Sequence, residues 1–466
     1  MRGRVAISLL CAPLIGASLI GHAADSAVAA VAAGSLVVPN WRAESNQVLA
    51  EYGTSLSSAG DVNGDGFDEV IVGAPEYSHG QGSEGRAYLY DGSASGLSRA
   101  PTWAAEGNQA SAYFGHSVST AGDVNGDGFD DVIVGADAYD GGQENEGKAF
   151  AYYGSASGLS DTPDWTGESN QSEAAYGVSV GTAGDVNGDG FDDVIVGALY
   201  WSGDLIDQGA AFVYLGSASG LSSTPAWEVE GDQQSELLGS SVGTAGDVNG
   251  DGFDDVIVGA TQYDNGQFDE GGAFVYLGSS SGVSTTPVWT GESNSDSAYY
   301  GVSVGTAGDV NGDGFDDVMV GAYNESPGGR AFAYYGSPSG PFLSPNWIMK
   351  ANQPASVGIS VGTAGDVNGD GFDDVMVGAF TWYNGQKDEG RAFVFQGSAS
   401  GLSSLADWVA EGNQSFAYFG FATGTAGDVN GDGFDDVIVG APEFDHGQLD
   451  EGMGFAYYGP IGAPGV

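Results

Sequence analysis

The sequence predicts an all-β fold, a seven-bladed β-propeller of four-stranded blades, and two observations lead to this expectation. The segment Gly-Asp-Val-Asn-Gly-Asp-Gly-Phe-Asp occurs seven times in the 466 residues, at intervals of 62 residues apart from one of 57. A tryptophan recurs on nearly the same beat, from Trp41 to Trp408. A long fixed period of this kind indicates a repeat array or a propeller, and propellers have about four to eight blades.

Each repeat is expected to contain four strands, as residues 165–225 illustrate. Trp165 to Ser169 is short and flanked by turn residues, and Gly177 to Ala183 alternates valine with small residues. After an Asp-rich turn, Val194 to Val196 is a β-branched run typical of a strand that is buried on both faces. The segment from Ala211 to Leu215 ends at a Gly-Ser turn signal. No segment has the sustained apolar period of a helix.

The two ends of the chain complement each other, which predicts that the ring closes. The last repeat stops after Phe455 to Gly459 without the Trp strand that follows every other repeat, whereas the chain begins with an extra one at Pro39-Asn40-Trp41. We therefore expect Trp41 to Glu44 to pair beside Phe455 to Tyr458 and to complete the last blade. Closure of this kind removes an exposed sheet edge.

The segments outside the repeats predict an exported protein. Residues 1–23 have the basic start, apolar stretch and small-residue end of a secretory signal peptide, and residues 24–36 form an Ala-rich linker. The propeller is expected to span residues 37–459, followed by a short tail, 460–466. The only cysteine, Cys11, lies in the apolar stretch, so the mature chain has no disulfide. This favours a secreted or periplasmic bacterial protein with its signal peptide removed, and no later apolar run is long enough to span a membrane.

The composition excludes some partners and requires others. The chain has 63 Asp and Glu against 10 Lys and Arg, with a formal net charge of −53. Such a chain cannot neutralise phosphates, so nucleic acid and anionic lipid are excluded as partners. Its carboxylates cannot be paired internally, and metal cations are the first candidates to compensate them.

The Asp-rich turn has the pattern of a calcium loop. In the first copy, Asp61, Asn63, Asp65 and Glu69 occupy positions one, three, five and nine, with glycine at position six and the backbone carbonyl of Phe67 at position seven. Oxygen donors on alternate residues around a sharp glycine bend suit calcium. Position twelve is a valine instead of the bidentate glutamate of a helical calcium loop, and the flanks are β-branched. The alternative is a plain hairpin turn, but a plain turn does not need four carboxylates, and uncompensated like charges destabilise.

The repeat resembles the FG-GAP repeat of the integrin α-subunit N-terminal domain and its bacterial relatives. The residues that carry the resemblance are Phe114-Gly115 and Phe419-Gly420 before the turn, and Gly73-Ala74-Pro75 and Gly440-Ala441-Pro442 after it. The resemblance implies a seven-bladed propeller with calcium in the turn between the first two strands of each blade. Integrins keep the metal motif in only some blades, whereas all seven turns are intact here.

Carried over to each copy, the resemblance implies up to seven Ca²⁺ ions, with side chains at positions one, three, five and nine and a phenylalanine carbonyl at position seven as ligands. The aspartate at position eight is an additional residue, and its side chain is expected either to point away from the ion or to support a ligand without contacting the ion itself. The implied ligands are Asp61, Asn63, Asp65, Phe67 and Glu69; Asp123, Asn125, Asp127, Phe129 and Asp131; Asp185, Asn187, Asp189, Phe191 and Asp193; Asp247, Asn249, Asp251, Phe253 and Asp255; Asp309, Asn311, Asp313, Phe315 and Asp317; Asp366, Asn368, Asp370, Phe372 and Asp374; Asp428, Asn430, Asp432, Phe434 and Asp436.

The most variable part of the repeat, between its second and third long strands, is the candidate for a binding surface. Its recurrent aromatic residues either contact a sugar or protein ligand or cap the packing of each blade. The recurrent tryptophans are expected to be structural. The loop aromatics are Tyr77, Tyr139, Tyr200, Tyr263, Tyr323, Tyr383 and Phe444.

Two function classes follow. The first is a monomeric, calcium-binding extracellular module that binds protein or carbohydrate in an adhesion-like way and is not an enzyme. The alternative is an extracellular hydrolase or lyase on glycans that uses acids of the top face or the central channel. An enzyme predicts one blade with unique polar residues, but the most deviant blade, the fifth, has only lost residues around Asn324 to Arg330. His79 and His446 occupy equivalent loops of the first and last repeats, and chance placement at the surface is the favoured interpretation of that pair.

Overall fold

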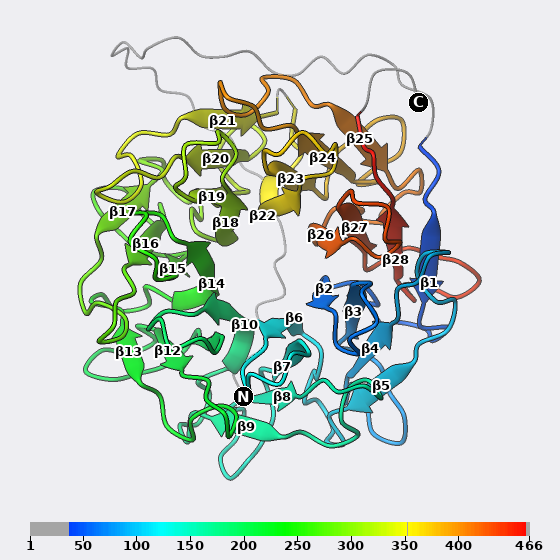
Figure 1. The fold of residues 1–466 in the computed structure, drawn as a ribbon, viewed down its shortest axis with the longest axis horizontal. Helices are drawn as coiled ribbons and strands as arrows, with labels where there is room; N and C mark the ends of the chain where they lie inside the picture. Colours follow the sequence, from blue (N-terminus) through cyan, green and yellow to red (C-terminus); the bar gives the residue numbers. More distant parts are fainter. Residues whose placement is uncertain (1–36, 352, 463–466) are drawn as a thin grey trace.

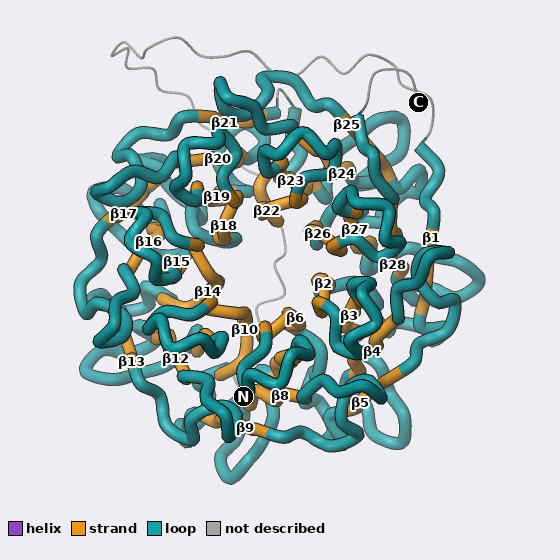
Figure 2. The backbone as a smooth tube through the Cα atoms, in the orientation of Figure 1, coloured by secondary structure: helices purple, strands orange, loops and turns teal. Residues whose placement is uncertain are grey.

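Seven four-stranded antiparallel sheets surround a central axis and form a closed propeller (Figure 1). The computed structural model describes residues 37–351 and 353–462, and within them every regular element is a strand (Figure 2). The predicted signal peptide, the linker and the last four residues of the predicted tail lie outside the described residues. The prediction of an all-β seven-bladed propeller is confirmed.

Blades are numbered here from the first complete sheet, so blade one is β2–β5 and blade seven is β26–β28 with β1. The strands are β1 (Trp41–Glu44), β2 (Leu56–Gly60), β3 (Glu69–Ala74), β4 (Arg86–Tyr90), β5 (Trp103–Glu106), β6 (Ser117–Gly122), β7 (Asp131–Ala136), β8 (Lys148–Tyr152), β9 (Trp165–Glu168), β10 (Tyr176–Gly184), β11 (Asp193–Ala198), β12 (Ala210–Tyr214), β13 (Trp227–Glu230), β14 (Leu238–Gly246), β15 (Asp255–Ala260), β16 (Gly272–Tyr276), β17 (Trp289–Glu292), β18 (Val304–Gly308), β19 (Asp317–Ala322), β20 (Arg330–Tyr334), β21 (Trp347–Lys350), β22 (Val357–Gly365), β23 (Asp374–Ala379), β24 (Arg391–Phe395), β25 (Trp408–Glu411), β26 (Thr423–Gly427), β27 (Asp436–Ala441) and β28 (Met453–Tyr457).

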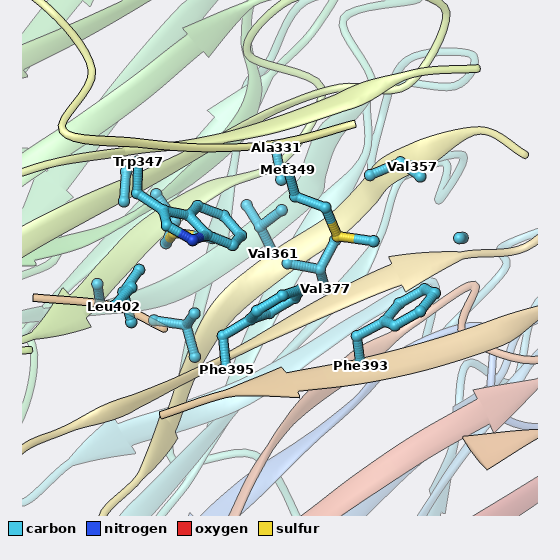
Figure 3. Close-up of a cluster of buried hydrophobic side chains, with 14 of the residues drawn as sticks. Ala331, Trp347, Met349, Val357, Val361, Val377, Phe393, Phe395 and Leu402 are labelled. Atoms are coloured by element: carbon cyan, nitrogen blue, oxygen red, sulfur yellow. The ribbon is translucent and has the colours of Figure 1, made fainter. Parts of the chain in front are cut away.

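The second strand of each blade is buried along its whole length because neighbouring blades cover both of its faces. In β7 all six residues are buried, and Val132 and Val134 belong to a core cluster that they share with the side chains of blade one. Figure 3 shows the equivalent cluster between blades five and six, where Trp347 and Met349 of β21 lie against Val361, Val377 and Phe395. The core is therefore a ring of seven seams between blades instead of one central cluster.

The ring closes through the first strand of the chain. Blade seven has the order β1-β28-β27-β26, and the β1–β28 register runs from Trp41 opposite Ala456 to Glu44 opposite Met453. The paired stretch of β28 begins two residues earlier than the segment that the sequence predicted. The Trp41 ring also contacts Tyr90 of blade one at 4.9 Å between centroids, and its Nε1 donates to the Ser98 carbonyl oxygen at 2.8 Å.

The recurrent tryptophans repeat this contact around the ring. Trp165, for example, contacts Tyr214 of the next blade at 4.9 Å and donates to the Ser222 carbonyl oxygen at 2.9 Å. The expected structural role of the tryptophans is confirmed. Beyond the last strand, Ile461 of the predicted tail is buried and its N–H donates to the Val367 carbonyl oxygen at 2.9 Å, so the tail begins packed against blade six.

The strand directions give the ring two distinct faces. The Asp-rich turns join the first and second strands of every blade and lie on one face, which we call the turn face. The opposite, loop face carries the connections from second to third strand, such as residues 75–85, and those from one blade to the next, such as residues 107–116. These two kinds of connection touch, since the Ser111 N–H donates to the Gly82 carbonyl oxygen at 2.8 Å.

Candidate metal centre

The first aspartate of each Asp-rich turn organises the turn backbone. In blade two, Asp123 Oδ1 accepts hydrogen bonds from the N–H groups of Gly126 (2.7 Å) and Asp127 (3.1 Å), and its Oδ2 accepts one from Gly128 (2.8 Å). The same three contacts occur in all seven turns. Gly128 has φ +89°, a conformation that favours glycine, so the bend depends on it.

The carboxylate at position nine is fully buried beneath the turn. Asp131 Oδ2 accepts from the Val124 N–H at 3.1 Å, and its Oδ1 accepts from the Gly154 N–H at 2.8 Å. Burial, opposed by the two backbone hydrogen bonds and assisted by the nearby carboxylates of Asp123 and Asp127, raises the pKa of Asp131 to about 8. A buried carboxylate among other carboxylates is costly without a compensating cation.

The first turn differs in one respect. Glu69 Oε2 accepts from the Val62 N–H at 2.9 Å, as the aspartates do, but its longer side chain turns Oε1 toward Asn63 Nδ2, also at 2.9 Å. Among the described residues, Glu69 has no recorded hydrogen bond to Gly92, the counterpart of Gly154. The substitution of Glu for Asp at position nine therefore keeps the contact with the turn backbone and loses the one with the following loop; the asparagine contact also occurs with aspartate in turns five to seven.

The asparagine at position three donates to the position-nine carboxylate in four turns, those of Asn63, Asn311, Asn368 and Asn430, and its nitrogen is left without a recorded partner in two others. The Nδ2 atoms of Asn187 and Asn249 are buried and have no hydrogen-bond partner within the described chain. Rotating a side-chain amide by half a turn exchanges its nitrogen and oxygen. In that orientation the oxygen becomes a buried acceptor without a donor, which is the environment that a cation completes.

The donor set fits a hard cation. Positions one, five and nine supply carboxylates, position three an amide, and none of the position-seven carbonyl oxygens in the described chain accepts a recorded hydrogen bond. Three carboxylates of one turn do not all lie within 4.8 Å of one another in the described residues. Oxygens on opposite sides of a calcium ion lie about 5 Å apart, given bonds of about 2.3–2.6 Å, so three carboxylates around one ion need not all lie within 4.8 Å of one another. The role of these residues as ligands stays a prediction.

The aspartate at position eight joins neighbouring blades, a role that the sequence did not reveal. Asp130 Oδ2 of blade two accepts from the N–H of Asp61, the first residue of the turn in blade one, at 2.8 Å. The Asp130 N–H in turn donates to the Asp61 carbonyl oxygen at 3.2 Å. The side-chain contact recurs at all seven blade junctions, including the one between Asp68 and Asp428 that closes the ring.

The loop aromatics mostly pack inward against their own blades. Tyr139 contacts Phe150 at 5.7 Å between ring centroids, and Tyr77, Tyr263 and Phe444 make the equivalent contact. In blades three and six the packing residues are Trp201 and Trp382, one position away from the predicted Tyr200 and Tyr383, which are exposed. Tyr323 stacks on Tyr299 at 5.8 Å. Most of these rings therefore cap the packing of their blades, which is the structural one of the two interpretations, the other being ligand contact.

Comparisons with known proteins agree with this geometry. A family model described as the FG-GAP repeat matches residues 52–90, 114–152, 176–214, 238–276 and 419–457, and one described as an FG-GAP-like repeat matches residues 309–377. Each FG-GAP match covers the first three strands of a blade and the Asp-rich turn.

Similar curated proteins are integrin alpha subunits. Integrin alpha-5 of Xenopus laevis is 28% identical over 242 residues, which cover 50% of this chain and 22% of the relative. Integrin alpha-V of Gallus gallus is 31% identical over 212 residues, covering 44% and 19%. Integrin alpha pat-2 of Caenorhabditis elegans is 34% identical over 227 residues, covering 45% and 18%. The chain spans about a fifth of the length of the curated relatives it matches.

Solved structures with a similar arrangement include the exotype rhamnogalacturonan lyase YesX and the rhamnogalacturonan lyase YesW. Both have a TM-score of 0.45, with 12% and 13% sequence identity, and the match covers 88% of this chain and 72% of each of them. Similarity at this level carries no functional information.

Proposed function

The chain is an FG-GAP repeat protein with an integrin-alpha-like propeller, and from that premise we propose that it is an exported, calcium-binding module whose loop face binds an extracellular partner. The observation that carries the proposal is the division of labour between the two faces. The turn face repeats one acidic pattern seven times, whereas the loop face differs from blade to blade and exposes more large apolar side chains than the turn face does.

Calcium is the cation that the turns suit best. Their donors are all oxygens, supplied by carboxylates, an amide and a carbonyl on a bent loop, and calcium accepts six to eight such ligands in flexible geometry. When bound, the ion would supply the positive charge that the turns lack. The chain's own residues hold the rest: Asp123 shapes the bend, Asp131 anchors it to the second strand, and Asp130 joins it to the previous blade.

The loop face has the character of a protein-binding surface. Phe268 and Ile206 on the loops of blades four and three are 65% and 59% exposed. Exposed apolar side chains gathered on one face are typical of interaction sites. The large apolar residues exposed on this face are Val48, Leu49, Tyr200, Leu205, Ile206, Phe268, Tyr383, Phe416 and Leu449.

A protein partner is favoured over a carbohydrate by the kind of side chain that is exposed. Sugars are bound by stacking on aromatic faces, but six of the seven blades use an aromatic ring of this loop to pack against the blade itself. Several residues left at the surface, such as Ile206 and Leu449, are aliphatic. Carbohydrate binding remains the second outcome of the test.

The test is a binding screen with matched surface variants. The purified chain, kept in calcium, is presented to extracellular protein fractions and to a glycan array. Binding that is lost in Phe268→Ser or Ile206→Ser and kept in Leu343→Ser, an exposed residue of the turn face, supports the loop face as the interaction site. A ligand that binds all three variants as well as it binds the parent chain would refute it.

A glycan-cleaving enzyme is the second candidate, and one group on the loop face favours it. Burial and the nearby carboxylates of Asp450 and Glu51 raise the pKa of Glu443 to about 7, and such a value suits a general acid near neutral pH. Release of reducing ends from a polysaccharide by the parent chain, abolished by Glu443→Gln, would establish this function. If the chain binds its partner but releases no product from any polysaccharide tested, the enzyme function is refuted and the interaction module is supported.

Export and oligomeric state complete the proposal. We place the mature protein outside the cell or in the periplasm because residues 1–23 have the pattern of a signal peptide. The part of the chain that the structure describes contains no helix long and apolar enough to cross a membrane. A monomer is expected because the ring is closed and each outermost strand is only four residues long, which limits pairing of its free edge with another chain.

A further inference from the structure

A histidine and two glutamates meet where the two ends of the propeller join. His446, on the loop before β28, has its Nδ1 2.7 Å from Oε2 of Glu44, which is the last residue of β1. Glu451 is buried beneath the same loop, and its Oε1 accepts from the His446 N–H at 2.7 Å. One ligand atom from each of the three side chains lies within 4.8 Å of the others, and no other such group occurs in the described residues.

Three of the other blades, namely one, two and six, have a cation in the same place. In blade one, His79 Nδ1 lies 3.2 Å from Glu106 Oε2, but Arg86 Nη1 also lies 3.3 Å from Glu106 Oε1. Lys148 pairs with Glu168 in blade two at 3.4 Å, and Arg391 pairs with Glu411 in blade six. In these three blades the first residue of the third strand is the cation and the last residue of the fourth strand is the glutamate.

Blade seven lacks that cation. The residue opposite Glu44 in the β1–β28 register is Met453, where blade one has Arg86. Glu44 has no ion pair with a lysine or arginine in the described chain, and its recorded side-chain partner is His446. The exposed Arg42, two residues earlier, makes no recorded ion pair with it. Two carboxylates and an imidazole therefore face each other where blades one, two and six hold a fixed positive charge. Blades three and four also lack the cation, since Ala210 and Gly272 lie opposite Glu230 and Glu292, but among the described residues neither has a histidine group of this kind.

We propose that Glu44, His446 and Glu451 bind a zinc ion that clasps the propeller ring. An imidazole nitrogen with two carboxylate oxygens is a donor set that zinc accepts, and three protein ligands leave a fourth position for water. The His446 side chain is 51% exposed, so an ion can enter from solvent. The site differs in chemistry from the turns of the opposite face, whose donors are all oxygen.

The position of the site gives it a structural consequence. Glu44 belongs to the N-terminal strand, whereas His446 and Glu451 come from the last repeat, about 400 residues later in the chain. An ion held by all three would connect β1 to the loop above β28. This connection would strengthen the one blade whose four strands do not come from a continuous stretch of chain. Zinc is expected to slow the opening of this junction.

The experiment measures zinc bound by the tag-free mature chain in millimolar calcium, which keeps the oxygen-only turns occupied. After dialysis against micromolar zinc, elemental analysis is expected to give about one zinc ion per parent chain. His446→Gln is expected to lose it and His79→Gln, the matched loop of blade one, to keep it. Met453→Arg, which restores the cation without removing a ligand, is expected to lose zinc, while Met453→Leu keeps it.

The reverse exchange adds a second readout. Arg86→Met removes the cation beside Glu106, but His79, Glu84 and Glu106 do not lie as close together as the blade-seven group does, so the zinc content is expected to stay at about one per chain. Melting in calcium checks that each variant is folded. A parent chain that retains no zinc, or a folded His446→Gln that retains as much as the parent, would overturn the proposal. Neither result bears on calcium binding by the turns, which is measured separately.

Discussion

At the scale of single residues, the aspartate at position eight of each turn connects two blades, because its side chain accepts a hydrogen bond from the turn of the preceding blade. The carboxylate of Asp130 bonds the backbone of the preceding blade, and Gly60 beside it has φ +71° and no room for a side chain, because a Cβ there would overlap the Asp130 carboxylate. Phe129, one residue earlier, packs on Gly64 of the same preceding turn. Each turn is thereby built to fit the turn before it.

The variant Asp130→Ala tests this junction. It removes a charged acceptor from the partly buried Asp61 N–H, and we expect the free energy of unfolding to fall by about 1.5–3 kcal/mol, measured by urea denaturation in calcium. Asp161→Ala, which removes an exposed carboxylate of the same blade, is the control for the change in charge. Equal stability of the two variants would show that the junction contributes nothing.

The motif alone predicted which residues gather in each turn, because alternation and the glycine bend are local properties of nine consecutive residues. It could not predict the contact of Asp130 with Asp61, because that contact depends on how one blade sits against the next, 69 residues apart. The exchange of Tyr200 for Trp201 as the packing ring has the same cause. Adjacent aromatic residues look equivalent until the strand pairing selects one of them.

At the scale of elements, the strand that closes the ring is the one whose removal is most informative. β1 has only four residues, but Trp41 inserts against Tyr90 and bonds the Ser98 carbonyl oxygen of blade one. Without β1 the paired edge of β28 would be exposed, and a free edge of this kind pairs readily with another chain.

A chain that starts at residue 45 is therefore expected to melt at a lower temperature and to form dimers or larger species, seen by light scattering after size exclusion. Losing the buried Trp41 side chain alone is expected to cost about 3–5 kcal/mol. A chain that starts at residue 37 keeps β1 and serves as the control. If both chains stay monomeric with the same melting temperature, closure by β1 does not contribute to the stability of the propeller.

The strands themselves were largely predictable, because a second strand covered on both faces needs a continuous β-branched run and a period of 62 residues fixes its place in every blade. The complementary ends of the chain predicted β1 in blade seven. The exact partners were less accessible: β1 pairs with Met453 to Ala456, two residues from the expected segment. That offset is what places Met453 opposite Glu44, so the candidate zinc site could not be recognised without the register.

At the scale of the whole molecule, the composition and the repeat explain each other. The turns contain 28 of the 63 acidic residues, so nearly half of the acidity that gives the net charge of −53 lies at seven equivalent places around one face. Adjacent turns share hydrogen bonds through the position-eight aspartates. Loss of a cation from one turn is thus felt at the next blade, and the ring is expected to unfold cooperatively when cations are removed.

The most direct test of this account is the thermal unfolding of the mature chain as calcium is added back. The protein is stripped of metal, and elemental analysis verifies that its calcium content is close to zero. Thermal unfolding is then followed across a calcium titration. We predict that the melting temperature rises steeply with calcium and levels off as bound calcium approaches seven ions per chain, since each site at 100 times its Kd adds about 2.7 kcal/mol. An identical melting temperature for verified stripped and verified loaded protein would contradict the account.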